Sequence, residues 1–414
     1  MAFLATAGNE SLVRYRAAAE LRGAYDRRDP DPCDLSVIPR VVTALQAELA
    51  AGICRRIVQA SLDRVVDIHA GRESVASRPL GWIAGLGATL PPEICGNVRL
   101  DFLLEDGRLR LLEGGWVNLS GVDYAPQAAL ALIDVAPQLA TDFHVERPAA
   151  QFRERLLERG TQRLAILVKE NHTVYAENDW NLIRTLLAPI ESLVVAEPDF
   201  HRIKLRAGAT GISVDGLACD AVYLRSLDGP AAFTGKHAEQ NRQTLALLLE
   251  SGVAFHDHPL TLLAEDKDLE WLVERDPGLR AVVPRTCRPA DVLRAESSQW
   301  VLKLRDLHSG EGVFLDDAEM AAHWDDPTAI LQARIEPDRF PVVTVHGFQG
   351  HAVADLAVHV SYRYDVARRQ LLVGTIAGYF SRFTLVGGKV NLCTGGGVIP
   401  VLSERPVVMA GGKS

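Results

Sequence analysis

The chain has 414 residues, of which 48% are apolar and 23% charged, so it is long enough for two or three domains with separate cores. Lys and Arg number 44 against 53 Asp and Glu, and the formal net charge of −9 argues against a nucleic-acid partner. No run approaches the roughly 18 apolar residues of a membrane span, and the first residues lack a signal-peptide pattern. The six cysteines form no CxxC pair, so we expect reduced thiols and a cytoplasmic protein.

The first third of the chain is expected to combine helices with one hairpin. Apolar residues three and four apart predict amphipathic helices over 9–28 and 38–69. A Gly-rich turn region follows over 80–97 and leads into a β-hairpin, NVRLDFLLEDG and RLRLLEGG, over 97–115. Residues 121–145 again have helical spacing.

From about residue 150 the pattern alternates between helix and strand. LAILVKE (164–170), SLVVAE (192–197) and DAVYLRS (220–226) predict strands, and the last of these leads into a helix over 236–251. This rhythm indicates a largely parallel sheet. The final part, 260–414, mixes short helices with turn-rich strands, which predicts an α+β arrangement with an antiparallel sheet. The expected fold class is therefore α/β joined to α+β.

The hairpin brings together three charged residues. With a three-residue loop over 105–107, odd-numbered residues of both strands share one face, so Arg99, Asp101 and Glu113 lie together. The other face then turns four apolar side chains to the core: Leu100, Phe102, Leu104 and Leu112. A two-residue Asp-Gly turn would instead separate Asp101 from Glu113 across the sheet. Paired carboxylates suit a hard divalent cation such as Mg²⁺, whereas the alternative is a surface hairpin with solvated charges.

A second group of candidate residues lies far downstream. Lys303 stands in an apolar strand and is followed by a turn with Gly310 and Gly312, which lets backbone N–H groups approach a phosphate beside the lysine charge. The alternative is an edge-strand lysine with its amine in solvent. Lys267 stands at a predicted helix start in AEDKDLEWL, and Gln332, in AILQARIEP, presents an amide either to a base or to water.

In this order the motifs resemble the circularly permuted branch of the ATP-grasp superfamily that includes glutathionylspermidine synthetase-like ligases. The matching elements are the R-x-D strand with a Glu twelve residues after the Asp, then EDK, VPRT, VLKLRDLHSGEGV, ILQARIEP and GTIAGYFSRFTLVGGKVNLCTGGGVIP. They cover roughly 95–120 and 255–400. The resemblance implies N-terminal helices with the carboxylate hairpin over 1–150, an α/β pre-grasp domain over 151–260 and nucleotide-binding subdomains over 261–414.

The resemblance also implies roles for individual residues. Asp101 and Glu113 would bind Mg²⁺, and Arg99 would contact the transferred phosphate as a catalytic residue. ATP would be held by two lysines, two glycines and a glutamine: Lys267, Lys303, Gly310, Gly312 and Gln332. The far wall of the site would contain a catalytic arginine, an asparagine and three glycines: Arg382, Asn391 and residues 395–397.

One position departs from the pattern of these ligases. They usually place an Asn two residues beyond the metal-binding Glu, and here that position is Gly115. Asn118, three residues further on, is a candidate substitute. The third metal contact is therefore unassigned.

Two further features lie in the middle segment. Arg225 ends the strand DAVYLRS and is a candidate for a substrate carboxylate or phosphate, because ligands gather at the carboxyl ends of parallel strands; a surface arginine is the alternative. His256 and His258 form the only close histidine pair, and without a third ligand nearby the pair indicates a structural role.

The resemblance implies an ATP- and Mg²⁺-dependent ligase. ATP would phosphorylate a small-molecule carboxylate, and an amine would attack the acylphosphate to form an amide. Two alternatives stay open: a nucleotide-binding partner protein without turnover, which the departure at Gly115 favours, and a kinase for a small alcohol that uses the same site. The long N-terminal helices could serve as a homodimer interface.

Overall fold

A computed structural model describes the chain in segments separated by short gaps. They are residues 9–24, 34–117, 124–170, 182–206, 210–227, 230–307, 312–385, 389–390 and 396–405. Within them no helix has the length and apolar character needed to cross a membrane.

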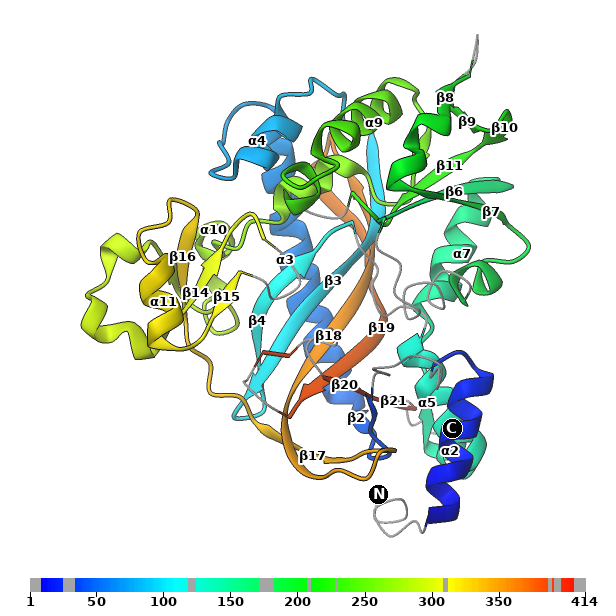
Figure 1. Cartoon of the computed structure of the whole chain (residues 1–414), viewed down its shortest axis with the longest axis vertical. Helices are drawn as coiled ribbons and strands as arrows, with labels where there is room; N and C mark the ends of the chain where they lie inside the picture. Colours follow the sequence, from blue (N-terminus) through cyan, green and yellow to red (C-terminus); the bar gives the residue numbers. More distant parts are fainter. Residues whose placement is uncertain are drawn as a thin grey trace, which may run out of the picture.

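A long, mostly antiparallel sheet runs through the centre of the molecule (Figure 1). Its strand order is β1-β20-β19-β18-β3-β4, and β17 also pairs with β18. The strands are β1 (Asp34–Leu35), β3 (Glu93–Glu105), β4 (Arg108–Gly115), β17 (Arg339–Val343), β18 (Gln349–Asp365), β19 (Gln370–Thr384) and β20 (Gly397–Ile399). Strands from both the first and the last third of the chain therefore build one sheet, and the antiparallel pairing predicted for the last third is confirmed.

Helices cover both faces of this sheet, which explains why β18 is buried along most of its length. On one face lies α3 (Ala44–His69), whose apolar stripe joins Val358 and Val360 in the main core. Thr43 and Gln46 form a capping box that starts α3. On the opposite face α5 (Tyr124–Val135) packs its Tyr124 ring edge-on against Phe380. That second face carries the odd-numbered residues of β3.

The middle of the chain forms a four-stranded parallel sheet, as predicted, and one face of this sheet shares the main core with α3 and β3. Its order is β12-β11-β6-β7. The elements are β6 (Arg163–Val168), β7 (Glu191–Ala196), β11 (Ala221–Leu224), β12 (Ala254–Phe255), α7 (Pro148–Glu158), α9 (Ala238–Glu250), η1 (Glu197–Arg202) and η2 (Pro230–Phe233). A small antiparallel sheet adjoins it, made of β8 (Ile203–Leu205), β9 (Ile212–Val214) and β10 (Leu217–Cys219).

A third body, here called the small lobe, projects to the left in Figure 1. Its sheet has the order β13-β16-β14-β15 and packs on its own core of Trp300, Leu302, Met320 and Trp324. The elements are β13 (Thr286–Cys287), η5 (Pro289–Asp291), η6 (Arg294–Gln299), β14 (Trp300–Leu304), β15 (Val313–Phe314), α11 (Asp317–His323) and β16 (Ala329–Ala333). Before them in the chain, α10 (Glu270–Arg275) and η4 (Pro277–Leu279) pack in the main core against α3.

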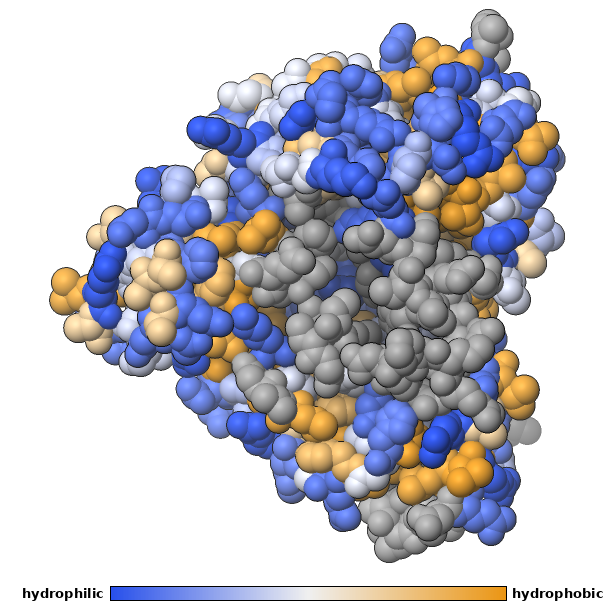
Figure 2. Space-filling view, viewed as in Figure 1, coloured by the Kyte–Doolittle hydropathy of each residue, from blue (hydrophilic) through white to orange (hydrophobic). Residues whose placement is uncertain are grey.

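Several predicted boundaries need correction. The first helix, α2 (Asn9–Leu21), ends before residue 28, and a short strand, β2 (Arg40–Val42), precedes α3. The predicted turn region over 80–97 contains the end of α4 (Arg78–Ala84) and the start of β3. The remaining elements are α6 (Leu139–Asp142), β5 (Phe143–His144), η3 (Pro259–Ala264) and β21 (Val401–Glu404). The fold is thus mixed α/β with several sheets, and on the face in Figure 2 the hydrophobic residues gather in separate groups on a largely hydrophilic surface.

Candidate active site

The predicted carboxylate pair forms, but through a different hairpin geometry. Glu105 pairs with Arg108, and Asp106 and Gly107 have φ angles of 52° and 70°, so the connection is a two-residue turn and not the predicted three-residue loop. A regular ladder from this turn would place Leu112 opposite Asp101. A β-bulge between Asp101 and Phe102 leaves Leu112 unpaired and restores the pairing of Asp101 with Glu113.

The bulge changes the surroundings of the apolar hairpin residues. Leu100 and Phe102 are buried in the main core, as expected, and Leu104 packs partly buried against it. Leu112 does not join them: it packs against a small cluster with Leu103 and Ile335. Its carbonyl group instead accepts a hydrogen bond from the Lys303 side chain, described below.

Asp101 is held between two arginines. It is 1% exposed, and Arg99 donates to both of its oxygens, from Nε at 2.7 Å and Nη2 at 2.9 Å. Arg382 on β19 donates from Nη2 to Oδ2 of Asp101 at 2.7 Å. Burial alone would raise the pKa of Asp101, but the charges of Arg99 and Arg382 outweigh burial and lower this pKa to about 2. Asp101 is therefore a carboxylate at neutral pH. The predicted grouping of Arg99 with Asp101 is present, and Arg382, which was expected on the far wall of the site, contacts the same carboxylate.

Lys303 lies on an interior strand, which excludes the edge-strand alternative. β14 is paired on both sides, and Lys303 is 5% exposed. Its Nζ donates to the carbonyl of Leu112 at 3.1 Å, and Nε2 of Gln332 donates to the same carbonyl at 3.4 Å. Burial lowers the pKa of Lys303 to about 8, although the negative charge of Glu113 acts to raise it. The carbonyl of Leu112, at the bulge, thus joins the carboxylate hairpin to two of the five residues predicted to hold nucleotide.

Lys267 joins the same group from the segment before α10, which begins three residues later than predicted for its helix. Its Nζ donates to the carbonyls of Leu304, at 3.0 Å, and Leu307. Burial lowers the pKa of Lys267, opposed by the charge of Glu113. Gly312 lies against the same turn, where an added Cβ would be 2.9 Å from the Cβ of Leu307, so a larger residue would not fit without a shift.

The other candidates are less fully placed. Arg225 directly follows β11, at the carboxyl end of a parallel strand as predicted, and its N–H donates to the Leu167 carbonyl at 2.8 Å. Gly310, Asn391 and Asn118 lie outside the described residues.

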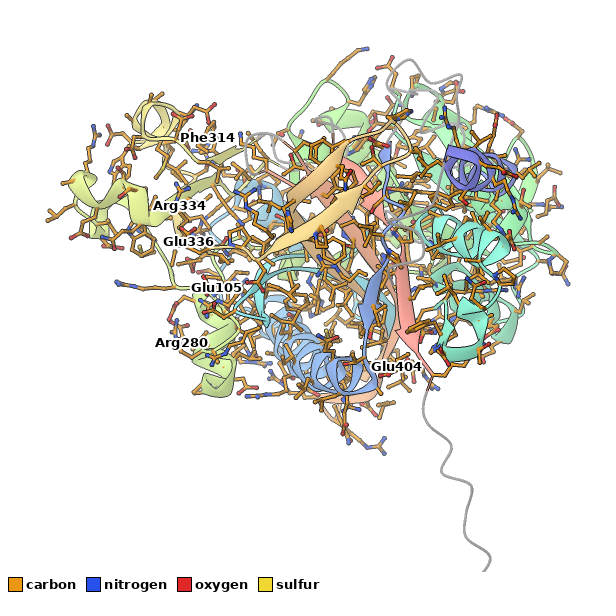
Figure 3. The ribbon with its side chains drawn as sticks, turned by 90° about the horizontal axis from the view of Figure 1, so that it is seen from below. Glu105, Arg280, Phe314, Arg334, Glu336 and Glu404 are labelled. Atoms are coloured by element: carbon orange, nitrogen blue, oxygen red, sulfur yellow. The ribbon has the colours of Figure 1, made fainter. Side chains whose placement is uncertain are left out.

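The segment between β16 and β17 is bound to the hairpin tip by polar contacts, and Figure 3 labels Glu105 and Glu336 at this junction. Glu105 accepts the Glu336 N–H at 2.9 Å. Asp338 accepts the N–H groups of Asp106, at 3.0 Å, and Gly107, at 2.8 Å. These contacts join the connection that leaves the small lobe to the tip of the carboxylate hairpin.

Two buried residues on the site face were missed from the sequence. Asp355 on β18 is fully buried, accepts the backbone N–H and the Nε–H of Arg382, and forms an ion pair with Nη2 of the same arginine. His359, directly opposite Arg99 in the strand register, is also fully buried, and burial lowers its pKa to about 3. A signal for both exists in the sequence: they interrupt the apolar run ADLAVHV four residues apart, and so share one face of a strand.

The donor set is compatible with Mg²⁺ carried by a nucleotide. Within the described part of the chain, no group of three or more His, Cys, Asp and Glu side chains is arranged to hold a metal alone. Mg²⁺ at nucleotide sites commonly takes one or two carboxylates, with phosphates and water as the other ligands. Asp101 and Glu113, opposite each other on adjacent strands, supply such a pair.

Comparison with known proteins adds a structural likeness. No protein-family model and no curated protein matches the chain. Among solved structures, it is similar to a glutathione synthetase-like effector (GSS30) from Globodera pallida in its apo form, with a TM-score of 0.69 and 12% identity. The match covers 95% of this chain and 96% of that chain. At this identity the likeness concerns the fold, and the chain accordingly has a glutathione synthetase-like fold.

Proposed function

We propose that the chain is an ATP-dependent ligase that joins a small-molecule carboxylate to an amine, in the circularly permuted ATP-grasp arrangement. The observation that carries this proposal is the pairing of Asp101 with Glu113 beside Lys303, within a glutathione synthetase-like fold. The carboxylates precede the lysines in the chain, which is the permuted order. The proposed domain boundaries are those predicted from the sequence.

The reaction divides into two balanced steps. A carboxylate oxygen of the acid attacks the γ-phosphorus of ATP, the bond to the bridging oxygen breaks, and ADP leaves. The amine nitrogen then attacks the acyl carbon, the bond to the phosphate oxygen breaks, the nitrogen loses a proton, and an amide and phosphate result. Both steps need positioned positive charge more than a nucleophilic side chain.

The residues of the site are assigned to these needs. Lys303 and Lys267 hold the nucleotide phosphates, and Gln332 lies on the nucleotide side of the site. Arg99 and Arg382 neutralise charge on the transferred phosphoryl group. Asp101 and Glu113 hold Mg²⁺, which when bound offsets the charge that spreads over the phosphoryl oxygens.

An ADP-release screen of carboxylic acids paired with amines, followed by mass analysis of the product, tests the proposal. A ligase gives equal amounts of ADP, phosphate and an amide, and Asp101→Asn should lower the rate by about 10² or more. A phosphorylated alcohol without free phosphate would instead identify a kinase. ADP release with every acid and amine pair that yields no amide would contradict the ligase.

A nucleotide-binding protein without turnover is the second candidate. The observation that favours it is the clamp on Asp101, whose two oxygens are both occupied by arginine donors. The absence of Asn at position 115 points the same way. ADP binding without ADP release for any acid and amine pair would establish this alternative.

A further inference from the structure

Three groups of Arg382 contact Asp355, whereas one contacts Asp101. Oδ1 of Asp355 accepts the backbone N–H of Arg382 at 2.6 Å, and Oδ2 accepts Nε at 2.7 Å. Nη2 of Arg382 also lies 2.5 Å from Oδ2 of Asp355. Both the backbone and the side chain of Arg382 are thereby fixed to one fully buried carboxylate.

The same Nη2 atom bridges Asp355 and Asp101. It lies 2.7 Å from Oδ2 of Asp101, which also accepts Nη2 of Arg99 at 2.9 Å. A carboxylate oxygen offers about two lone pairs, so two donors use the acceptor capacity of this oxygen fully. A cation that binds Oδ2 of Asp101 must therefore displace one of the two arginine donors.

Displacement of Arg382 leaves that residue anchored. The contacts from the backbone N–H, Nε and Nη2 to Asp355 do not involve Asp101, so the departure of Nη2 from Asp101 breaks none of them. The N–H of Nη2 that had bonded Asp101 is then free to donate to another acceptor, next to the position proposed for the transferred phosphoryl group. Arg382 can thus exchange Asp101 for an anionic substrate without a large movement.

We propose that Asp355 is a positioning residue that holds Arg382 in the site while a metal–nucleotide complex takes over Asp101. This inference rests on the proposed function of the site. It explains why a carboxylate is buried beside the predicted metal ligand, and it assigns Asp355 a role that acts through Arg382 and not through the metal.

Mn²⁺ titration with ADP measures this exchange without catalysis. Carboxylate and water ligands suit Mn²⁺ as well as Mg²⁺, and electron paramagnetic resonance separates bound from free Mn²⁺. In Asp355→Asn the amide still accepts an N–H but has no charge, so Arg382 is drawn more strongly to Asp101. We expect Mn²⁺ affinity in the presence of ADP to fall about tenfold. Asp67→Asn, which removes another arginine-bound carboxylate on α3, is the matched control and should leave this affinity unchanged.

The Arg382→Ala background distinguishes positioning from direct metal binding. If Asp355 acts through Arg382, adding Asp355→Asn to Arg382→Ala causes no further loss of Mn²⁺ affinity. An equal loss in both backgrounds would make Asp355 a metal ligand and overturn the proposal, as would equal affinities of the wild type and Asp355→Asn.

A second variant covers the case in which Asp355→Asn does not fold. Asp355→Glu keeps the charge but moves the carboxylate by one methylene, and a smaller loss is expected that again requires Arg382. A wild-type chain that binds no Mn²⁺ with ADP would overturn the proposed function and this inference together. Normal wild-type binding with unaffected Asp355 variants would overturn this inference alone.

Discussion

Lys303 gives the site a predicted pH response. Burial lowers the pKa of its ammonium group to about 8, and a bound phosphate would favour the charged form and raise this pKa. ADP should therefore bind with constant affinity below pH 8 and progressively more weakly above it, by at most about tenfold per pH unit, with uptake of a proton. Calorimetric titrations between neutral pH and pH 10 measure this slope. Lys303→Met should weaken binding about tenfold or more at neutral pH and lose the slope; an unchanged slope would contradict the assignment.

Asp257 supplies a second residue-level prediction, about stability. It is buried, its Oδ1 accepts the Asn97 N–H at 2.6 Å, and burial raises its pKa to about 8. The folded chain therefore retains a proton that the unfolded chain loses above its ordinary pKa of 3.8. Between these values the contribution of Asp257 to folding stability falls as pH rises, by up to about 1.4 kcal/mol per unit.

Asp257→Asn should remove this decline. We expect the melting temperature of the variant, measured by circular dichroism, to rise relative to that of the wild type between pH 5 and pH 8. Parallel melting curves for the two proteins across this range would show that Asp257 is ionised in the folded chain.

At the level of elements, the hairpin shows how far its sequence determines the site. The letters Glu-Asp-Gly fit both a three-residue loop and a two-residue turn, and only the second occurs. The bulge at Leu112 has no local signal, because it depends on packing against Leu103 and on acceptance of the Lys303 ammonium. The pairing of Asp101 with Glu113 was thus predicted, but its cause was not.

The junction at the hairpin tip gives an element-level prediction. Asp338→Ala removes the acceptor of two turn N–H groups, at Asp106 and Gly107, and should lower the free energy of unfolding by about 1–2 kcal/mol. Amide hydrogen exchange over residues 105–108 should become faster. Asp338→Asn retains one carbonyl oxygen and should have a smaller effect. Exchange at the tip that is equal in all three proteins would contradict the anchoring role.

At the level of the whole molecule, local patterns predicted the strands and the parallel sheet, because apolar alternation and turn residues act over short distances. They did not predict which distant segments share a sheet. Asp355 was missed for this reason: an acidic residue in an apolar strand indicates an outward side chain until Arg382, 27 residues later, is known to lie beside it. The order of the motifs, which spans the chain, is what assigns roles to the candidate residues that local patterns left open, and those roles stay predictions.

An ionic network joins distant elements and predicts acid sensitivity. Asp67 on α3 accepts donors from Arg369, in the β18–β19 turn, and from Arg275, on α10. The hydrogen bond from Arg369 is the main cause that lowers the pKa of Asp67 in the folded chain. The ionised Asp67 therefore stabilises the fold fully above the ordinary pKa of 3.8, and this stabilisation is lost as the pH falls through the lower folded-state pKa. Asp67→Asn should cost about 1–2 kcal/mol at pH 7 and less at pH 3, as measured by urea unfolding. An equal cost at both pH values would contradict this role.

The transfer of oxygen from acid to phosphate tests the proposed ligase most directly. An acid substrate found in the ADP-release screen is labelled with ¹⁸O in both carboxyl oxygens, and the phosphate released with the amide is analysed by mass spectrometry. Carboxylate activation at this site predicts one ¹⁸O atom in each phosphate, because the bridging oxygen of the acylphosphate comes from the acid. Unlabelled phosphate would contradict the account, because the oxygen that the acid loses on amide formation would then have left by another route.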